Sequence, residues 1–247
     1  MPGIDRNPKE EYSKNHIPGA IFFDLDKNSD QDTDLPHMLP KKEKWEEIVS
    51  SMGISNTDRI VIYDNSDVLS SCRGWYNFIY YGHAKLFASA FDSGLKKWLI
   101  ENRKTTSEKT ILNNSTYRAT EDKNLVKSIH EINENIEQKN FTIIDARSKE
   151  RFNGSVPDPR KNVRSGSIPN SVCLPFKEII NSSDNTFKDV SEISKKFSEI
   201  IDLNDDKRVF SCGSGITACV LGLAYSLVNN TYSPTVYDGS WAEYGRI

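Results

Sequence analysis

The sequence lacks the features that define several large protein classes. Its four cysteines, Cys72, Cys173, Cys212 and Cys219, lie far apart without a CxxC pair. This spacing argues against a zinc ribbon or a disulfide scaffold and fits a reducing compartment. The longest nearly apolar run, 218–228, is well short of the roughly 20 residues that a membrane-spanning helix needs. We therefore expect no membrane association.

An excess of charge of one sign is also missing. The net charge is −3, and the charged residues, 27% of the chain, include both signs. No surface for nucleic acid or an anionic membrane is therefore expected. The phosphate-binding patterns GxGxxG and GxxxxGK do not occur, which leaves nucleotide binding without support. The start, MPGIDRNPKEEY, resembles neither a signal nor a transit peptide, so we expect a cytoplasmic protein, with mitochondria as the alternative.

What the chain does contain is an alternation of strand-like and helical runs. At 247 residues it has room for two domains. The runs RIVIYD (59–64) and FTIIDAR (141–147) are typical of buried strands followed by loops and helices, which favours an α/β fold around a mainly parallel sheet. A polar stretch without apolar periodicity predicts a linker. The expected boundaries are 1–104 for the first domain, 105–124 for the linker and 125–247 for the second domain.

The two halves also resemble one another. The prolines of HIPGAIFFD and SIPNSVCLPF, Pro18 and Pro169, lie 151 residues apart. Asp64, at the end of IVIYD, lies 148 residues before Cys212, and the motifs FDSG and YDGS lie 146 residues apart. Similar offsets in the same order indicate a duplicated domain. The run IIDA (143–146) has no counterpart, because the matching position would precede Met1, so we expect a first domain without its N-terminal strand.

The stretch RVFSCGSGITACVLGLAYSLV contains the most informative cysteine. Cys212 is predicted at a strand-to-helix turn, where free N–H groups and the helix dipole favour a thiolate. Gly213 and Gly215 would let the loop fold tightly and direct N–H groups at the sulfur. The competing interpretation is a small buried core residue, the commonest fate of a free cysteine. We assign that packing role to the other three cysteines.

Taken together, the repeat and the motifs HIPGAIFFDLD, HMLP, RFNGSVPDPR, CGSGITAC and YDGSW resemble the two-domain rhodanese family over essentially the whole chain. The uncharged loop CGSGIT is similar to that of the 3-mercaptopyruvate sulfurtransferase branch, whereas thiosulfate sulfurtransferases carry basic residues there. The resemblance implies two tandem rhodanese-like domains, each a mainly parallel sheet flanked by helices. It also implies that the first domain is catalytically silent, because Asp64 occupies the position of Cys212.

The resemblance further implies which residues would bind the substrate. Arg151 and Arg160 match the arginines that hold the carboxylate of mercaptopyruvate, a task for which a planar guanidinium suits better than an ammonium. Asp26, His37 and Ser214 match a proton relay across the domain interface, which would deliver a proton to the departing enolate. The remaining substrate-binding positions belong to the cysteine loop: Gly213, Gly215, Ile216 and Thr217.

The mechanism we expect is covalent. The Cys212 thiolate takes the sulfur of 3-mercaptopyruvate as a persulfide, releases pyruvate and passes the sulfur to cyanide, a small thiol or a thioredoxin-like protein. No metal or organic cofactor is needed.

Three other functions compete with this interpretation. A thiosulfate donor is disfavoured because the loop carries no positive charge. A cysteine phosphatase would need CxxxxxR, but this chain has Ala218 at the arginine position. A noncatalytic sulfur-carrier or interaction module would follow if the missing first strand disabled the site.

Overall fold

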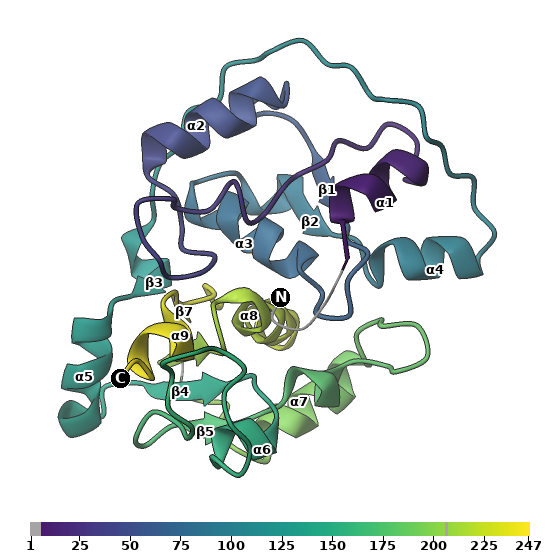
Figure 1. Ribbon diagram of the computed structural model, residues 1–247. Helices are drawn as coiled ribbons and strands as arrows, with labels where there is room; N and C mark the ends of the chain where they lie inside the picture. Colours follow the sequence, from purple (N-terminus) through teal and green to yellow (C-terminus); the bar gives the residue numbers. More distant parts are fainter. Residues whose placement is uncertain (1–5, 206) are drawn as a thin grey trace.

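The computed structural model describes residues 6–205 and 207–247, which form two α/β halves (Figure 1). In the first half the chain forms helices and two short strands in this order: α1 (Pro8–Lys14), α2 (Lys42–Ser51), β1 (Ile60–Ile62), α3 (Ser71–Tyr80), η1 (Lys85–Phe87), β2 (Ala88–Ala90) and α4 (Gly94–Ile100). Strands β1 and β2 pair in parallel, with Ile60 opposite Ala88.

The second half contains the larger sheet. Its elements are η2 (Lys123–Leu125), β3 (Val126–Lys127), α5 (Ile129–Gln138), β4 (Thr142–Asp145), α6 (Lys149–Phe152), β5 (Val172–Cys173), η3 (Phe176–Ile179), α7 (Val190–Ser198), β6 (Arg208–Ser211), α8 (Ile216–Val228), β7 (Val236–Tyr237) and α9 (Ser240–Tyr244). Among the described residues the strand order is β3-β7-β6-β4-β5, with every neighbouring pair parallel. The predicted α/β architecture around parallel sheets is confirmed.

The central strand of the second half, β6, is buried on both faces. All four residues of β6 are buried, as expected for a strand covered by helices on either side. It lies between β4 and β7. In the described part of the first half, the corresponding strand β1 pairs only with β2, and Val61 in its middle is 63% exposed.

Helices α3 and α8 join the two halves. They lie side by side at the centre of the molecule (Figure 1), and every residue of α3 is buried. Their apolar side chains contribute to one core that includes residues of both halves, among them Trp45, Tyr76, Phe210 and Leu221. This shared core fixes the orientation of the first half relative to the loop that precedes α8.

The polar stretch between the halves runs over the outer side of the first half (Figure 1). Thr106 forms a bridge with His16, and the N–H of the buried Tyr117 donates a hydrogen bond to the Ser50 hydroxyl. The segment therefore packs against the first half along its length. Among the described residues, every helix is too short or too polar to cross a membrane.

Candidate active site

Cys212 lies where the sequence predicts it, between the end of β6 and the start of α8. The residue is 2% exposed. Gly215 adopts a left-handed conformation with φ of 77° immediately before the helix, a conformation that glycine adopts without steric cost. A Cβ atom at this position would also come within 2.7 Å of Arg73 Nη1. Ile216 is buried and Thr217 partly buried in the first turn of α8.

The conformation of the cysteine loop is fixed by the start of α9. The Ser240 hydroxyl accepts hydrogen bonds from the N–H groups of Cys212 (3.2 Å) and Gly215 (3.1 Å), and it donates to the Tyr237 carbonyl (2.8 Å). The Trp241 N–H donates to the Cys212 carbonyl (3.0 Å). The Gly215 amide is therefore engaged by a hydroxyl, whereas the sequence suggested that it would be directed at the sulfur.

Two guanidinium groups lie over this loop. A Cβ atom added to Gly213 would lie 3.2 and 3.3 Å from the two terminal nitrogens of Arg160 and 3.4 Å from Arg151 Nη2. Asp158 accepts from both side chains, at 2.6 Å from Arg151 and 3.4 Å from Arg160. Burial opposes the charge of Asp158, but hydrogen bonds from the Arg151 side chain and the Arg160 backbone, together with both positive charges, outweigh it and lower the pKa of Asp158. The carboxylate thus keeps both cations beside the loop.

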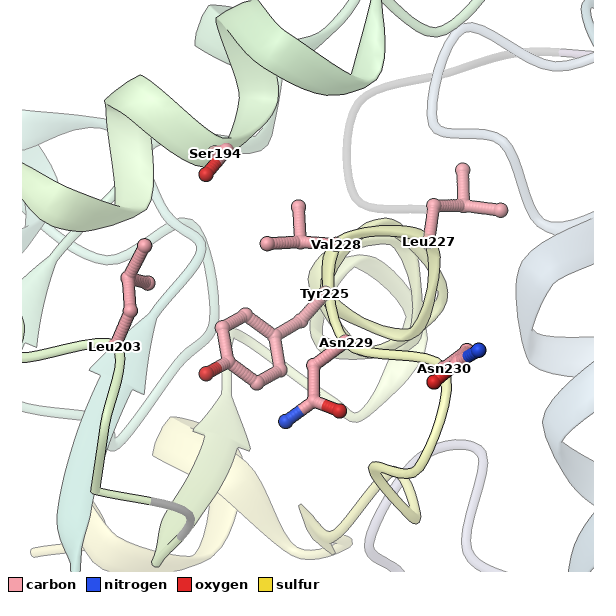
Figure 2. Close-up of a pocket in the computed structure, with 7 residues that line it drawn as sticks. All are labelled: Ser194, Leu203, Tyr225, Leu227, Val228, Asn229 and Asn230. Atoms are coloured by element: carbon pink, nitrogen blue, oxygen red, sulfur yellow. The ribbon is translucent and has the colours of Figure 1, made fainter.

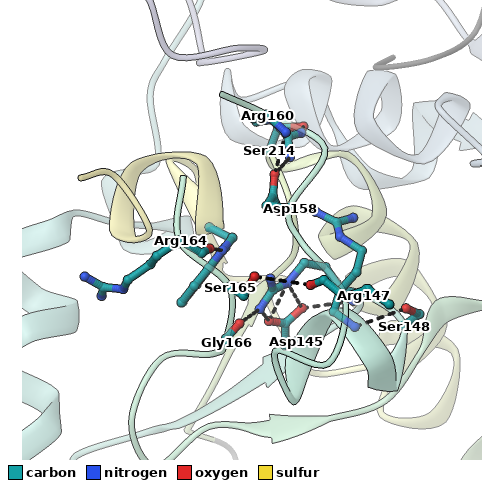
Figure 3. Close-up of polar contacts among 12 residues, drawn as sticks. Asp145, Arg147, Ser148, Asp158, Arg160, Arg164, Ser165, Gly166 and Ser214 are labelled. Carbon is teal, nitrogen blue, oxygen red and sulfur yellow. Dashed lines mark hydrogen bonds and ion pairs between the residues drawn. The ribbon is translucent and has the colours of Figure 1, made fainter. Parts of the chain in front are cut away.

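Figure 3 shows how the segment that carries these arginines, α6 and the loop after it, is anchored. At the end of β4, the buried Arg147 forms hydrogen bonds through Nε and Nη2 with Asp145, and Nη2 also donates to the Gly166 carbonyl. The Arg147 guanidinium stacks on Trp241 at 4.5 Å from the ring centre. Farther along, Arg160 Nη2 donates to Ser214 Oγ at 3.1 Å. The arginine loop is therefore attached to the sheet at one end and to the cysteine loop at the other.

The three residues of the expected relay are in contact. His37 Nδ1 lies 2.9 Å from Ser214 Oγ, and Nε2 lies 3.0 Å from Asp26 Oδ1. When Asp26 accepts the Nε2 proton, Nδ1 is free to accept the proton of the serine hydroxyl. The hydrogen bond from His37 lowers the pKa of Asp26, although this carboxylate is 75% exposed. The histidine of the first half thus reaches the serine of the cysteine loop and is held from behind by Asp26.

The other three cysteines have environments that suppress thiolate formation. Burial raises the pKa of Cys219 to about 12, with Arg73 acting in the opposite direction, and its thiol donates to the Gly215 carbonyl. Burial, reinforced by Asp145, also raises the pKa of Cys173 to about 12. Complete burial moves the pKa of Cys72 well above its usual value. These environments suit packing.

Sequence reasoning did not select Asp158 or Ser240. Asp158 stands two residues before Arg160 in VPDPR, and Ser240 belongs to the quoted YDGSW motif. An acidic residue within reach of two clustered arginines was the available signal for Asp158. No comparable signal marked Ser240, because its role depends on the sheet bringing β7 next to β6.

A separate cavity of about 500 Å³ lies at the far end of α8 (Figure 2). It is lined by Ser194, Leu203, Tyr225, Leu227, Val228, Asn229 and Asn230. Helix α8 has 13 residues and is therefore about 20 Å long, at 1.5 Å per residue. Because Cys212 precedes its first turn, this cavity is not part of the cysteine site.

Comparison with known proteins identifies the family of the chain. The rhodanese-like domain model matches the chain twice, over residues 3–101 and 128–246. The chain belongs to the rhodanese family. The duplication expected from the sequence is thus a repeat of the rhodanese-like domain.

Individual members of the rhodanese family resemble the chain over almost all of its length. The thiosulfate/3-mercaptopyruvate sulfurtransferase 1, mitochondrial, of Arabidopsis thaliana is 38% identical, covering 99% of this chain and 69% of the relative. The 3-mercaptopyruvate sulfurtransferase of Mus musculus is 36% identical, covering 99% and 82%. A solved structure of the 3-mercaptopyruvate sulfotransferase SseA from Escherichia coli superposes with a TM-score of 0.84 at 29% identity, covering 98% of this chain and 88% of that one.

Proposed function

We propose that the protein is a 3-mercaptopyruvate sulfurtransferase that carries the transferred sulfur on Cys212. The observation that carries this proposal is the convergence of two guanidinium groups and a hydrogen-bonded serine–histidine–aspartate chain on Gly213 and Ser214, the two residues after the cysteine. The cations suit the carboxylate of a keto acid. The relay suits a leaving group that must gain a proton. The names of the relatives support the same activity.

The first half-reaction breaks the carbon–sulfur bond of the donor. The Cys212 thiolate attacks the donor sulfur, a new S–S bond forms, and the electron pair of the broken C–S bond becomes the enolate of pyruvate. Arg151 and Arg160 hold the carboxylate. Ser214 gives its proton to the enolate carbon and takes one back from Nδ1 of His37, which enters this step as the imidazolium with Asp26 on Nε2 and leaves it as the neutral ring. Pyruvate departs and the cysteine remains as a persulfide.

The second half-reaction returns the enzyme to its starting form. A thiolate acceptor or cyanide attacks the outer sulfur of the persulfide, and the Cys212 thiolate leaves. With cyanide the product is thiocyanate. With a small thiol or a thioredoxin-like dithiol the product is an acceptor persulfide, from which a second thiol releases hydrogen sulfide as it forms a disulfide. Both half-reactions use only the protein's own side chains.

Thiosulfate is the second donor candidate, because the Arabidopsis relative carries both donors in its name. Thiosulfate is a dianion, and the loop residues from Gly213 to Thr217 carry no charge. Arg151 and Arg160 are therefore its only proposed anchors. We expect 3-mercaptopyruvate to have the higher kcat/KM, and a marked preference for thiosulfate would reverse the assignment of the donor.

The decisive experiment measures where sulfur is attached. The protein is incubated with 3-mercaptopyruvate without acceptor and analysed by intact mass and peptide mapping, alongside Cys212→Ser and the control Cys173→Ser. We expect one added sulfur on the peptide containing Cys212 and a matching release of pyruvate, retained in the Cys173 variant. Absence of both in the parent protein would favour a noncatalytic carrier or interaction module.

For the cellular location, we propose the cytosol, with mitochondria as the alternative that the name of the Arabidopsis relative supports. Fractionation of cells that express the protein at its natural level distinguishes the two.

A further inference from the structure

A fully buried arginine of the first half reaches into the second half directly beneath the cysteine loop. Arg73, on α3, is 0% exposed. Its Nη1 donates to Asp238 Oδ1 at 2.6 Å and to the Gly215 carbonyl at 3.3 Å. Its Nη2 donates to the carbonyl of His37 at 2.7 Å. One guanidinium therefore contacts the backbone of the relay histidine and the last residue of the cysteine loop.

Asp238 completes this contact from the other side. Its second oxygen, Oδ2, accepts the N–H of Leu39 at 2.8 Å, two residues after His37. Burial disfavours the charge of Arg73, but the neighbouring Asp238 carboxylate outweighs that effect. The pKa of Arg73 therefore lies above its usual value. The buried ion pair thus binds the 37–39 turn of the first half by both a carbonyl and an amide.

The backbone of His37 needs such support. Its φ is 64°, a left-handed conformation that a non-glycine residue keeps only when its surroundings impose it. Ring contacts to Asp26 and Ser214 fix one end of the residue, whereas Arg73 fixes its carbonyl. Because the Nδ1–Oγ distance is 2.9 Å, a displacement of the turn by about 1 Å would break the contact with Ser214.

We propose that Arg73 and Asp238 form a positioning pair that aligns the His37 turn of the first half with the cysteine loop of the second, so that the Ser214–His37–Asp26 relay is closed. Neither residue touches a reacting atom in the proposed mechanism. The inference rests on the proposed function, because it assigns the pair to the proton-delivery step of that reaction.

This role predicts an effect that depends on the donor. Departure of pyruvate enolate from 3-mercaptopyruvate requires a proton, whereas sulfite leaves thiosulfate as a stable anion without one. Loss of alignment should therefore reduce kcat/KM for 3-mercaptopyruvate more than for thiosulfate. A pair that merely stabilised the fold would lower both in parallel.

The test compares both donors with cyanide as the acceptor. The variants are Arg73→Lys, which keeps the charge but loses the planar fork, and Arg73→Met/Asp238→Asn, which leaves no unpaired buried charge. His37→Ala is the reference for a broken relay. Arg118→Met is the matched control, because Arg118 is exposed and pairs with Glu46 outside the site. For each variant, the ratio of kcat/KM for the two donors and the thermal unfolding temperature are measured.

We expect the ratio of mercaptopyruvate to thiosulfate kcat/KM to fall by roughly 10- to 100-fold in the double variant, the size of effect that a small misplacement of a catalytic group produces. The fall should approach that of His37→Ala and be smaller in Arg73→Lys, with Arg118→Met unchanged. If the double variant fails to fold, a fall of the donor ratio in Arg73→Lys tests the proposal in its place.

Two results would overturn different parts of this account. If His37→Ala changes the ratio while the folded Arg73 variants leave it unchanged, the pair is structural and the positioning role is wrong. If His37→Ala itself leaves the ratio unchanged, the relay is not used and the proposed mechanism fails at that step, whatever the Arg73 variants do.

Discussion

The loops that follow β1 and β6 occupy corresponding places in the two halves, yet each holds a different group. In the first half Asp64 fills this place. Its Oδ2 accepts the N–H of Ser71, at the start of α3, at 2.7 Å, and the hydroxyls of Ser70 and Ser66 at 3.2 and 3.3 Å. In the second half the place belongs to Cys212, at the start of α8. The first loop thus surrounds its own carboxylate, whereas the second presents a thiol.

The two loops share one feature of their backbone support. The Leu95 N–H donates to the Asp64 carbonyl at 2.9 Å, as the Trp241 N–H does to the Cys212 carbonyl at 3.0 Å. The preceding residues, Gly94 and Ser240, have φ angles of 54° and 50°. This backbone support is therefore preserved in both copies, although the sheets and the side chains of the two loops differ.

The first half nevertheless places side chains at the second loop. His37 contacts Ser214 and is itself held by Asp26, and Arg73 contacts Gly215. In the proposed mechanism, one copy therefore supplies the nucleophile while the other supplies the relay and its support.

Moving the thiol from the second loop to the first gives the largest expected effect and tests the difference between the two loops most directly. In Asp64→Cys/Cys212→Ser a cysteine stands in the first loop and none in the second. We expect sulfurtransferase turnover to fall on the order of 10⁴-fold or more, as in enzymes that lose their nucleophile, with no recovery relative to Cys212→Ser alone. The reason is that Arg151 and Arg160 lie over the second loop only. If peptide mass analysis finds sulfur attached at position 64, this expectation is wrong, because the first loop would then need only a cysteine to accept sulfur.

The second prediction concerns the relay that links the halves. Ser214→Ala removes the hydroxyl that His37 and Arg160 contact. We expect kcat for 3-mercaptopyruvate to fall by roughly 10²- to 10⁴-fold, the usual contribution of general acid catalysis, while sulfur loading from thiosulfate is reduced far less. Ser226→Ala, whose hydroxyl donates to the Gly222 carbonyl on α8, is the control. Equal loss with both donors would contradict a role in proton delivery.

Much of this organisation is predictable from the sequence because it is local. A β-branched run followed by a glycine loop and an apolar helix indicates β6, the Cys212 turn and α8, and similar offsets indicate the repeat. The residues matched by family resemblance, such as His37 and Arg160, also lie at the second loop. These features depend on short motifs whose chemistry can be recognised in isolation.

The remaining features depend on contacts between distant segments. Arg73 and Asp238 are 165 positions apart, and neither stands in a pattern that distinguishes a buried ion pair from a solvated charge. Ser240 looks like an ordinary turn residue until β7 places it beneath the cysteine loop. Burial and pairing between the halves decide these roles, and a single sequence does not encode them in any periodicity.

The third prediction makes the second half resemble the first at one position. Ser240→Gly keeps a residue that tolerates the left-handed backbone but removes the hydroxyl that accepts from the amides of Cys212 and Gly215. Unpairing buried amides costs about 1–3 kcal/mol, so we expect turnover to fall by roughly 10-fold. Steady-state kinetics with 3-mercaptopyruvate measure it. Unchanged turnover would show that the Ser240 hydroxyl does not hold the cysteine loop in place.

The smallest predicted effect concerns the carboxylate of the first loop and its dependence on pH. Burial raises the pKa of Asp64 above its ordinary value of 3.8, and hydrogen bonds from Ser71 and its neighbours only partly oppose this. The folded protein therefore prefers the protonated acid. The resulting stabilisation is complete below the ordinary pKa and is lost as the pH rises through the raised pKa. Asp64→Asn cannot ionise, so its free energy of unfolding should improve relative to the parent as the pH increases.

Urea denaturation at a series of pH values checks this prediction, and Asp58→Asn provides a control of opposite sign. The hydrogen bond from the Ser55 backbone lowers the pKa of Asp58, so its stabilisation is present above the ordinary pKa and is lost as the pH falls through the lowered one. The free energy of unfolding of Asp58→Asn should therefore fall relative to that of the parent as the pH increases. If the difference in free energy of unfolding between Asp64→Asn and the parent does not change with pH, the first loop stabilises the carboxylate anion fully. The two loops would then differ in the thiol and its partners, and not in their capacity to hold a negative charge.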